Sequence, residues 1–279
     1  MQRVVCWDVD RVWYPGISTS YCADQSVSNP RPYLEGFLDR GWFTPADVAA
    51  WAAYRGKDPD APIARMADLA AMLTDFFYEL KSGGRPVLSK PQAVEGKQSL
   101  LTGTTMSEIR AIADGVPLTP GFRETVASLR GCGVYQAAFS DGLGPFVSYV
   151  ARREGMDHWG VVPAAVIAGN RKTLFSDEML DRDDVVLTGI VDRYDKSIAL
   201  FDHLEVAGYT LTEVAAIDDS AANIPTLKKI QQGGGVAVGF NPLDEDAFRR
   251  ERIPILRGRA LEPFGEIVRD PRAVEDLCV

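Results

Sequence analysis

Two pairs of aspartates follow apolar runs at well-separated points of the chain. Asp8 and Asp10 come directly after residues 4–7, and Asp218 and Asp219 close a second apolar run. A single aspartate is most often a helix cap or a turn residue. Two carboxylates at one strand end, however, repel each other unless a cation lies between them or one of them is protonated. Each pair therefore indicates a metal-ion site or an acid–base site.

Three further polar residues could act together with these carboxylates. Ser140 closes the run 134–140, and its hydroxyl could either cap the next helix or join backbone N–H groups in binding an anion. Lys196 lies in a helix-like segment, where a lysine is ordinarily solvated, and Asn223 follows Asp219 by one helical turn. Each residue taken alone has an ordinary structural explanation, and only the combination with the acidic pairs points to chemistry.

The elements that must position these residues are strands and helices that alternate from residue 116 onward. The predicted strands cover residues 4–7, 134–140, 213–219, 236–240 and 253–256. Between them lie helix-like segments, the first of which offers Thr119 as its N-cap and Pro120 as its first helical residue. This alternation predicts a doubly wound, mostly parallel, Rossmann-like α/β sheet. Ligands of such sheets bind outside the carboxyl ends of the strands, so we expect the acidic pairs to converge there.

Residues 16–115 carry a different pattern. Three segments, at 44–56, 61–84 and 104–115, have helical periodicity, and no convincing strand lies among them. A strand–helix–strand unit needs only about 30 residues, so the surplus predicts an inserted all-helical subdomain. We therefore expect a sheet domain formed by residues 1–15 and 116–279 and a helical domain formed by residues 16–115.

Composition narrows the class of protein. The 279 residues carry a net charge of −9, which argues against a nucleic-acid or anionic-membrane partner. No apolar run reaches the roughly 18 residues of a membrane span, and the predicted strand at the N-terminus leaves no room for a signal peptide. The four cysteines are scattered without metal-site spacing, which favours a reducing, cytoplasmic location. The pattern does not predict an oligomeric state.

The order of the motifs resembles that of the haloacid dehalogenase (HAD) superfamily of aspartate-nucleophile phosphohydrolases. The four motifs are a strand followed by D-x-D, a strand followed by serine, a lysine on a helix, and a strand followed by the stretch IDDSAAN. The insert lies where that superfamily has its C1-type helical cap. The segments LTPGFRETVASLRGCGVYQAAFSDG and VAAIDDSAANIPTLKKIQQGGGVAVGFNP are most similar to the phosphoserine phosphatase branch.

The resemblance implies a role for each motif. Asp8 would be the nucleophile that forms an aspartyl-phosphate, and Asp10 the general acid and base. The Asp8 carboxylate, the Asp10 backbone carbonyl and Asp219 would bind Mg²⁺. The phosphoryl group would be held by Ser140, Asp141, Gly142 and Lys196, with Asp218 and Asn223 as orienting residues behind them. The expected substrate is a small phosphorylated metabolite.

Several positions depart from that superfamily's pattern. Arg11 and Val12 replace the usual small residues after D-x-D, and Asp218 and Asn223 replace a glycine and an acid in the last motif. A catalytically weak or inactive phosphate-binding homologue, a phosphomutase and a phosphotransferase therefore stay open as alternatives. The candidate substrate contacts are Arg11, Tyr14 and Arg31.

Overall fold

The computed structural model describes residues 2–26, 29–101, 104, 106–140, 142–160 and 193–279. The described chain divides into two compact units. The first, called here the sheet unit, holds the described residues up to Pro15 and from Val116 onward. The second, the insert unit, spans Gly16–Gly115.

The sheet unit is built on one six-stranded sheet in which every neighbouring pair of strands is parallel. The strand order is β5-β4-β1-β6-β7-β8. The strands are β1 (Val4–Trp7), β4 (Tyr135–Phe139), β5 (His158–Gly160), β6 (Val214–Asp218), β7 (Val236–Phe240) and β8 (Ile255–Leu256). β1 therefore lies in the middle of the sheet, between β4 and β6. This arrangement confirms the predicted doubly wound α/β class.

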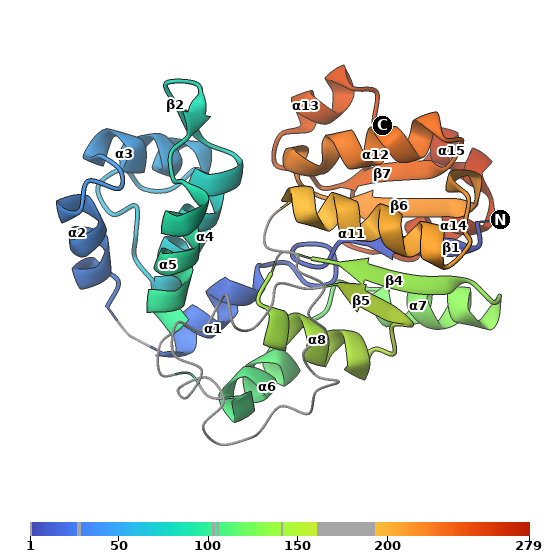
Figure 1. The fold of residues 1–279 in the computed structure, drawn as a ribbon, viewed down its shortest axis with the longest axis horizontal. Coiled ribbons are helices and arrows are strands. Elements are labelled where there is room, and N and C mark those ends of the chain that lie inside the picture. The colour runs from blue at the N-terminus through green and yellow to red at the C-terminus, as the bar shows by residue number, and fades with distance from the viewer. Residues whose placement is uncertain (1, 27–28, 102–103, 105, 141, 161–192) are drawn as a thin grey trace. The chain divides into compact units, whose positions relative to one another are not determined.

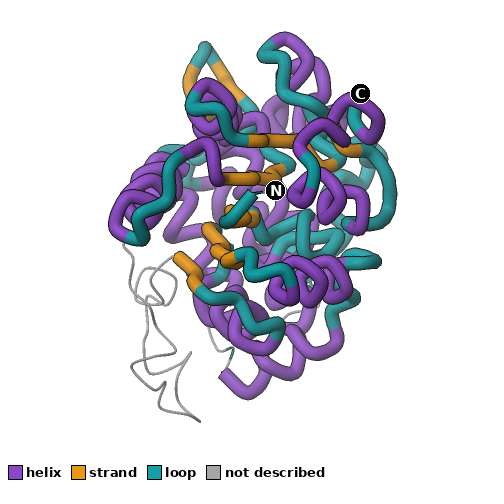
Figure 2. The backbone as a smooth tube through the Cα atoms, turned by 90° about the vertical axis from the view of Figure 1, so that its right-hand side faces the viewer, coloured by secondary structure: helices purple, strands orange, loops and turns teal. Residues whose placement is uncertain are grey.

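Helices lie on both faces of the sheet (Figures 1 and 2), and the last two of them follow the final strand. They are α7 (Phe122–Gly131), α8 (Gly144–Arg153), α11 (Arg193–Val206), α12 (Ile224–Gln232), α13 (Glu245–Arg250), α14 (Glu262–Arg269) and α15 (Val274–Leu277). Short 3-10 turns occur at Leu211–Glu213, Ala221–Asn223 and Pro271–Ala273.

The central strand is buried on both faces, which explains its continuous apolar sequence. Successive side chains of a strand point to opposite faces. Cys6 lies in one buried cluster with residues of α11 and α12, such as Leu200. Trp7 packs edge to face against Phe122 of α7 and Phe264 of α14, with ring centroids 5.7 and 5.1 Å apart. The first charged residue after this strand, Asp8, therefore marks the edge of the core.

The insert unit contains six helices among its described residues. These are α1 (Ser18–Ser26), α2 (Arg31–Asp39), α3 (Pro45–Tyr54), α4 (Met66–Tyr78), α5 (Lys90–Leu101) and α6 (Met106–Gly115). They enclose a separate core that includes Trp51, Leu69 and Phe76. Buried Asp75 accepts hydrogen bonds from Trp51 Nε1 at 2.7 Å and from Arg55 Nε at 2.6 Å, which ties α3 to α4.

Two local expectations are wrong. The insert is not purely helical, because Gly83 and Gly84 adopt φ values of 59° and 79° and form a tight turn. This turn pairs β2 (Lys81–Ser82) with β3 (Arg85–Pro86) in a short antiparallel hairpin. Thr119 is also not a helix N-cap, because α7 begins two residues after Pro120, with Gly121 as N-cap.

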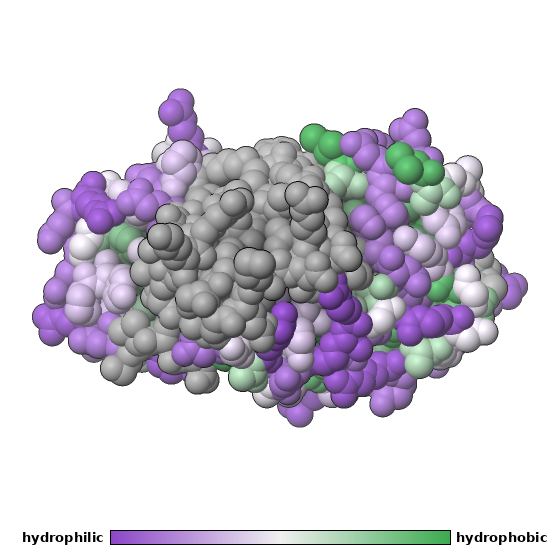
Figure 3. All heavy atoms as spheres, turned by 60° about the horizontal axis from the view of Figure 1, so that its bottom comes forward, coloured by the Kyte–Doolittle hydropathy of each residue, from purple (hydrophilic) through white to green (hydrophobic). Residues whose placement is uncertain are grey.

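No helix in the described part of the chain is long and apolar enough to cross a membrane. On the face seen in Figure 3, hydrophilic residues dominate the described surface, and apolar residues form small, separate groups.

Candidate active site

Asp8 of the first acidic pair meets both members of the second pair at the carboxyl ends of the central strands. The backbone N–H of Asp8 donates to the Ile217 carbonyl at 3.0 Å, which extends the pairing of β1 with β6 by one residue. One oxygen from each of Asp8, Asp218 and Asp219 lies within 4.8 Å of the others, and all three residues are buried. Residues some 210 positions apart in sequence therefore form one carboxylate cluster, as expected from the sheet topology.

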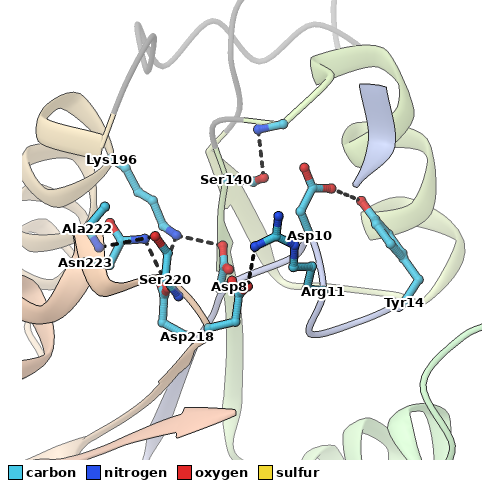
Figure 4. Close-up of polar contacts among 12 residues, drawn as sticks. Asp8, Asp10, Arg11, Tyr14, Ser140, Lys196, Asp218, Ser220, Ala222 and Asn223 are labelled. Atoms are coloured by element: carbon cyan, nitrogen blue, oxygen red, sulfur yellow. Dashed lines mark hydrogen bonds and ion pairs between the residues drawn. The ribbon is translucent and has the colours of Figure 1, made fainter. Parts of the chain in front are cut away.

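Lys196 enters this cluster from α11 (Figure 4). Its Nζ donates to Asp8 Oδ1 at 2.6 Å and to Asp218 Oδ2 at 2.9 Å. The lysine is only 5% exposed, so it is not the solvated helix residue that its sequence alone would favour. A buried ammonium group needs anionic partners, and the two aspartates supply them.

Asp218 and Asn223, the two unusual residues of the last motif, contact each other. Asp218 Oδ1 accepts hydrogen bonds from the Ser220 backbone N–H at 2.9 Å and from Asn223 Nδ2 at 3.0 Å. The neutral Asn223 therefore orients Asp218, and Asp218 provides the negative charge next to Lys196. Lys196 therefore has an acidic partner from this motif although Asn223 is neutral.

Arg11 contacts the remaining carboxylate of the cluster. It adopts a left-handed backbone conformation with φ of 65°, and its Nη1 donates to Asp219 Oδ2 at 3.2 Å. The side chain of Arg11 is 20% exposed and that of Asp219 is 6% exposed. The arginine therefore bridges the loop after β1 and the loop after β6, a contact that no local sequence pattern predicts.

The carboxyl groups of Asp8 and Asp219 have raised pKa values because they are buried and close to other carboxylates. Burial raises the pKa of Asp8 well above its usual range, the neighbouring Asp218 charge adds to this, and Lys196 opposes it. Burial also raises the pKa of Asp219 to about 6, with Arg11 opposing and Asp218 reinforcing the shift. Crowded, desolvated carboxylates of this kind are stabilised in their ionised form by a cation.

The donors in this cluster fit a hard divalent ion. They are carboxylate oxygens, which Mg²⁺ prefers to nitrogen or sulfur. Both oxygens of Asp218 already accept hydrogen bonds. This favours Asp8 and Asp219 over Asp218 as direct ligands.

Ser140 lies at the end of β4, the strand on the other side of β1. Its side chain is buried, and its Oγ accepts a hydrogen bond from the Gly142 backbone N–H at 3.0 Å. The helix that follows, α8, begins only at Gly144, with Leu143 as N-cap, so Ser140 is not a helix cap. Asp141 lies outside the described residues.

Asp10 and Tyr14 form a second polar contact beside the cluster. The Tyr14 hydroxyl donates to Asp10 Oδ1 at 2.7 Å (Figure 4). Tyr14 is fully buried and its phenol faces the candidate acid, and its contact with substrate stays a prediction. Arg31 belongs to the insert unit, where its exposed side chain pairs with Glu35 at 2.7 Å.

Sequence reasoning missed three features of this site. They are the Tyr14–Asp10 hydrogen bond, the Arg11–Asp219 ion pair and the anchoring of the loop after β1 by Thr119. The spacing of Asp10 and Tyr14 was visible in the sequence, but only the turn conformation brings their side chains together.

No family model matches the chain. A phosphoserine phosphatase of Halobacterium salinarum is 32% identical over 162 residues, which cover 57% of this chain and 68% of that relative. Among solved structures, a substrate-bound phosphoserine phosphatase complex has a TM-score of 0.57 at 15% identity and covers 96% of this chain and 98% of its own. A HAD-family hydrolase from Salmonella enterica serovar Typhi has a TM-score of 0.58 at 14% identity, and the match covers 92% of this chain and 67% of that hydrolase.

The structural likeness at these identities defines the class: this is the fold of the HAD hydrolases. The sequence relation to the Halobacterium enzyme then settles the branch. The chain belongs to the phosphoserine phosphatase-like branch of the HAD superfamily and is a phosphoric monoester hydrolase. The resemblance found in the sequence motifs is thereby confirmed.

Proposed function

We propose that this protein is a Mg²⁺-dependent phosphatase that hydrolyses a small-molecule phosphate monoester through an aspartyl-phosphate on Asp8. The observation that carries the proposal is the buried cluster of Asp8, Asp218 and Asp219 with Lys196 at the carboxyl ends of β1 and β6. The relation to a phosphoserine phosphatase supports a small phosphorylated substrate, without specifying phosphoserine for this chain.

Each residue has a distinct part in this proposal. A carboxylate oxygen of Asp8 attacks phosphorus, and Asp10 protonates the leaving oxygen and later deprotonates the attacking water. Lys196 and Ser140 offer hydrogen bonds to the phosphoryl oxygens. The Gly142 backbone N–H, which donates to Ser140 Oγ in this structure, and Asp141, which lies outside the described residues, are proposed for the same role.

The ion would be held by the Asp8 carboxylate, the Asp10 backbone carbonyl and Asp219, with Asp218 and Asn223 orienting Lys196 behind them. Bound there, Mg²⁺ would supply the positive charge that offsets the carboxylates and the incoming phosphate. The insert unit is proposed to act as the cap that selects the substrate. The four cysteines form no disulfide in the described part of the chain, which is in keeping with the predicted cytoplasmic location.

The test of this function is phosphate release from a panel of phosphorylated metabolites with Mg²⁺, with EDTA, and with Asp8→Asn. We expect Asp8→Asn to reduce turnover to background while the unfolding midpoint stays close to that of the parent, because the amide is isosteric but not nucleophilic. Brief incubation with ³²P-labelled substrate should label the parent at Asp8, and EDTA should abolish turnover until Mg²⁺ is restored.

Near-normal turnover of Asp8→Asn would overturn the proposed nucleophile. Absence of phosphate release from every substrate in the panel would favour the inactive phosphate-binding homologue. A phosphorylated second product in place of free phosphate would favour a phosphomutase or phosphotransferase.

A further inference from the structure

The loop after β1 folds back so that Asp10 and Tyr14 lie side by side. The two residues form an isolated backbone bridge, and the Tyr14 hydroxyl donates to Asp10 Oδ1 at 2.7 Å. Three residues separate them in sequence, and these residues form a turn and not a helix, so the contact depends on the turn. A hydrogen bond from a buried phenol to one oxygen of a carboxyl group is directional, so it restrains the orientation of that group.

The turn between them is held at several points. The Trp13 backbone N–H donates to the Val9 carbonyl at 2.9 Å, and Arg11 takes the left-handed conformation that closes the turn. Thr119, from a distant part of the sequence, contacts the same turn: its backbone N–H donates to the Trp13 carbonyl at 2.7 Å, and its Oγ1 donates to the Val12 carbonyl at 2.6 Å. The backbone that carries Tyr14 is therefore fixed to the segment that precedes α7.

The ring of Tyr14 is also fixed. It is fully buried, and it packs edge to face on Phe146 of α8, with ring centroids 5.5 Å apart and planes at 76°. A buried aromatic ring in such a contact has few alternative rotamers. The hydroxyl is therefore presented to Asp10 by a rigid support instead of sampling solvent.

We propose that Tyr14 is a positioning residue for the acid–base chemistry of Asp10, an inference that rests on the proposed function. With Oδ1 accepting from Tyr14, the carboxyl group is oriented so that Oδ2 carries the transferred proton. In the first step an Asp8 oxygen bonds to phosphorus, the bond from phosphorus to the leaving oxygen breaks, and the Asp10 Oδ2 proton moves to that oxygen. In the second step water attacks phosphorus, its proton returns to Asp10, and the Asp8–phosphorus bond breaks.

The test uses two aryl phosphates of nearly equal size, p-nitrophenyl phosphate and phenyl phosphate. p-Nitrophenolate leaves readily without a proton, whereas phenolate, with a conjugate-acid pKa of about 10 like that of tyrosine, benefits from general acid catalysis. We measure pre-steady-state release of the phenol, so that only the first step is read. For Tyr14→Phe we expect release from phenyl phosphate to slow by about 10-fold, a part of the roughly 10²- to 10⁴-fold that general acid catalysis contributes, because Asp10 is retained but less well oriented. Release from p-nitrophenyl phosphate should change by less than about 3-fold.

A merely structural role for Tyr14 would slow both substrates equally, and that result would overturn the inference. Tyr135→Phe is the matched control, because Tyr135 lies at the opposite end of β4 from Ser140; it should leave both rates unchanged. As a second variant, 3-fluorotyrosine at position 14 keeps both ring and hydroxyl, and should preserve the parent's ratio of the two rates.

Asp10→Asn separates this inference from the function on which it rests. If Asp10→Asn shows the selective loss with phenyl phosphate and Tyr14→Phe does not, only the role of Tyr14 fails. If Asp10→Asn slows both substrates alike, the acid role of Asp10 itself fails. If Asp8→Asn retains phenol release, the proposed function fails.

Discussion

At the residue scale, three buried carboxylates of the site form ion pairs with two basic side chains. Lys196 bonds to Asp8 and Asp218, and Arg11 bonds to Asp219. The arginine thus donates to one of the oxygens that the proposed ion would use. Because a guanidinium and a divalent cation compete for the same carboxylate, Arg11 should weaken metal binding in the free enzyme.

Arg11→Ala should therefore tighten Mg²⁺ binding, measured by isothermal titration calorimetry without substrate. We expect roughly a 3- to 10-fold lower Kd, which corresponds to about 0.7–1.4 kcal/mol. In the parent protein, a bound Mg²⁺ should displace the Arg11 guanidinium from Asp219 and leave it able to contact the phosphate. Arg11→Ala lacks this contact and should therefore raise KM for substrate.

Arg3→Ala is the control for this prediction, since Arg3 also pairs with an acid of the sheet unit, Glu213, at 2.6 Å. It should leave the Mg²⁺ affinity unchanged. Weaker Mg²⁺ binding in Arg11→Ala would show that the arginine supports the ion site instead of competing with it.

At the element scale, the site depends on how the loop after β1 is attached to the rest of the sheet unit. Thr119 makes this attachment through its backbone N–H and its hydroxyl, which reach Trp13 and Val12. The residue lies just before α7, the helix that covers one face of β1 and β4. A residue that looks like a helix cap in the sequence thus serves as an anchor for the loop that carries Asp10.

Thr119→Val should lower the free energy of unfolding by about 1–3 kcal/mol, because it leaves the Val12 carbonyl without its hydroxyl donor. The measurement is urea-induced unfolding. Turnover should fall as well, since Asp10 and Tyr14 lie on the loosened turn.

Thr125→Val is a matched control for this substitution. Thr125 is also buried, 3% exposed, but its Oγ1 has no hydrogen-bond partner among the described residues. Replacing its hydroxyl with a methyl group should be neutral or stabilising. Equal losses in the two variants would mean that volume, and not the Thr119 hydrogen bond, determines the effect.

At the scale of the whole molecule, each unit contains a carboxylate whose pKa is lowered by basic partners. Burial alone would raise the pKa of Glu154 in the sheet unit, but hydrogen bonds from Arg123 and Arg153 outweigh it and lower the pKa. In the insert unit burial also opposes the shift, and hydrogen bonds from Lys57 and the Arg65 backbone lower the pKa of Asp68. Both carboxylates therefore bind fewer protons in the folded state than in the unfolded state.

Such groups stabilise the fold above their unfolded pKa, at about pH 4, and this contribution disappears as pH falls through the lower folded pKa. Glu154→Gln and Asp68→Asn should each be less stable than the parent at pH 7, with a difference that shrinks as the pH is lowered below about 4. The measurement is the urea midpoint as a function of pH. Glu124→Gln, at an exposed position of α7, is the control, and a pH-independent difference for Glu154→Gln would contradict the expectation.

Much of this architecture could be predicted from the sequence because it depends on local patterns. The alternation of apolar runs and helical periodicity specifies the order of strands and helices, and parallel strands bring their carboxyl ends to one edge. Asp8 and Asp219 were singled out for that reason, whereas Lys196, which lies on a helix, was singled out by the order of the motifs and the family resemblance. The hairpin at Gly83 and Gly84 was missed because two glycines after a helix are equally typical of a helix end.

The sequence by itself determined the α/β class, the family and the carboxylates that meet at the sheet edge. Only the tertiary structure decided which charges pair within that cluster. Arg11 reaches an acid 208 positions away, and Tyr14 bonds to Asp10 because Arg11 adopts a left-handed conformation and Thr119 pins the turn. Periodicity and spacing record which face a residue lies on, whereas side-chain pairing depends on turn geometry and on distances between distant segments, which no local pattern contains.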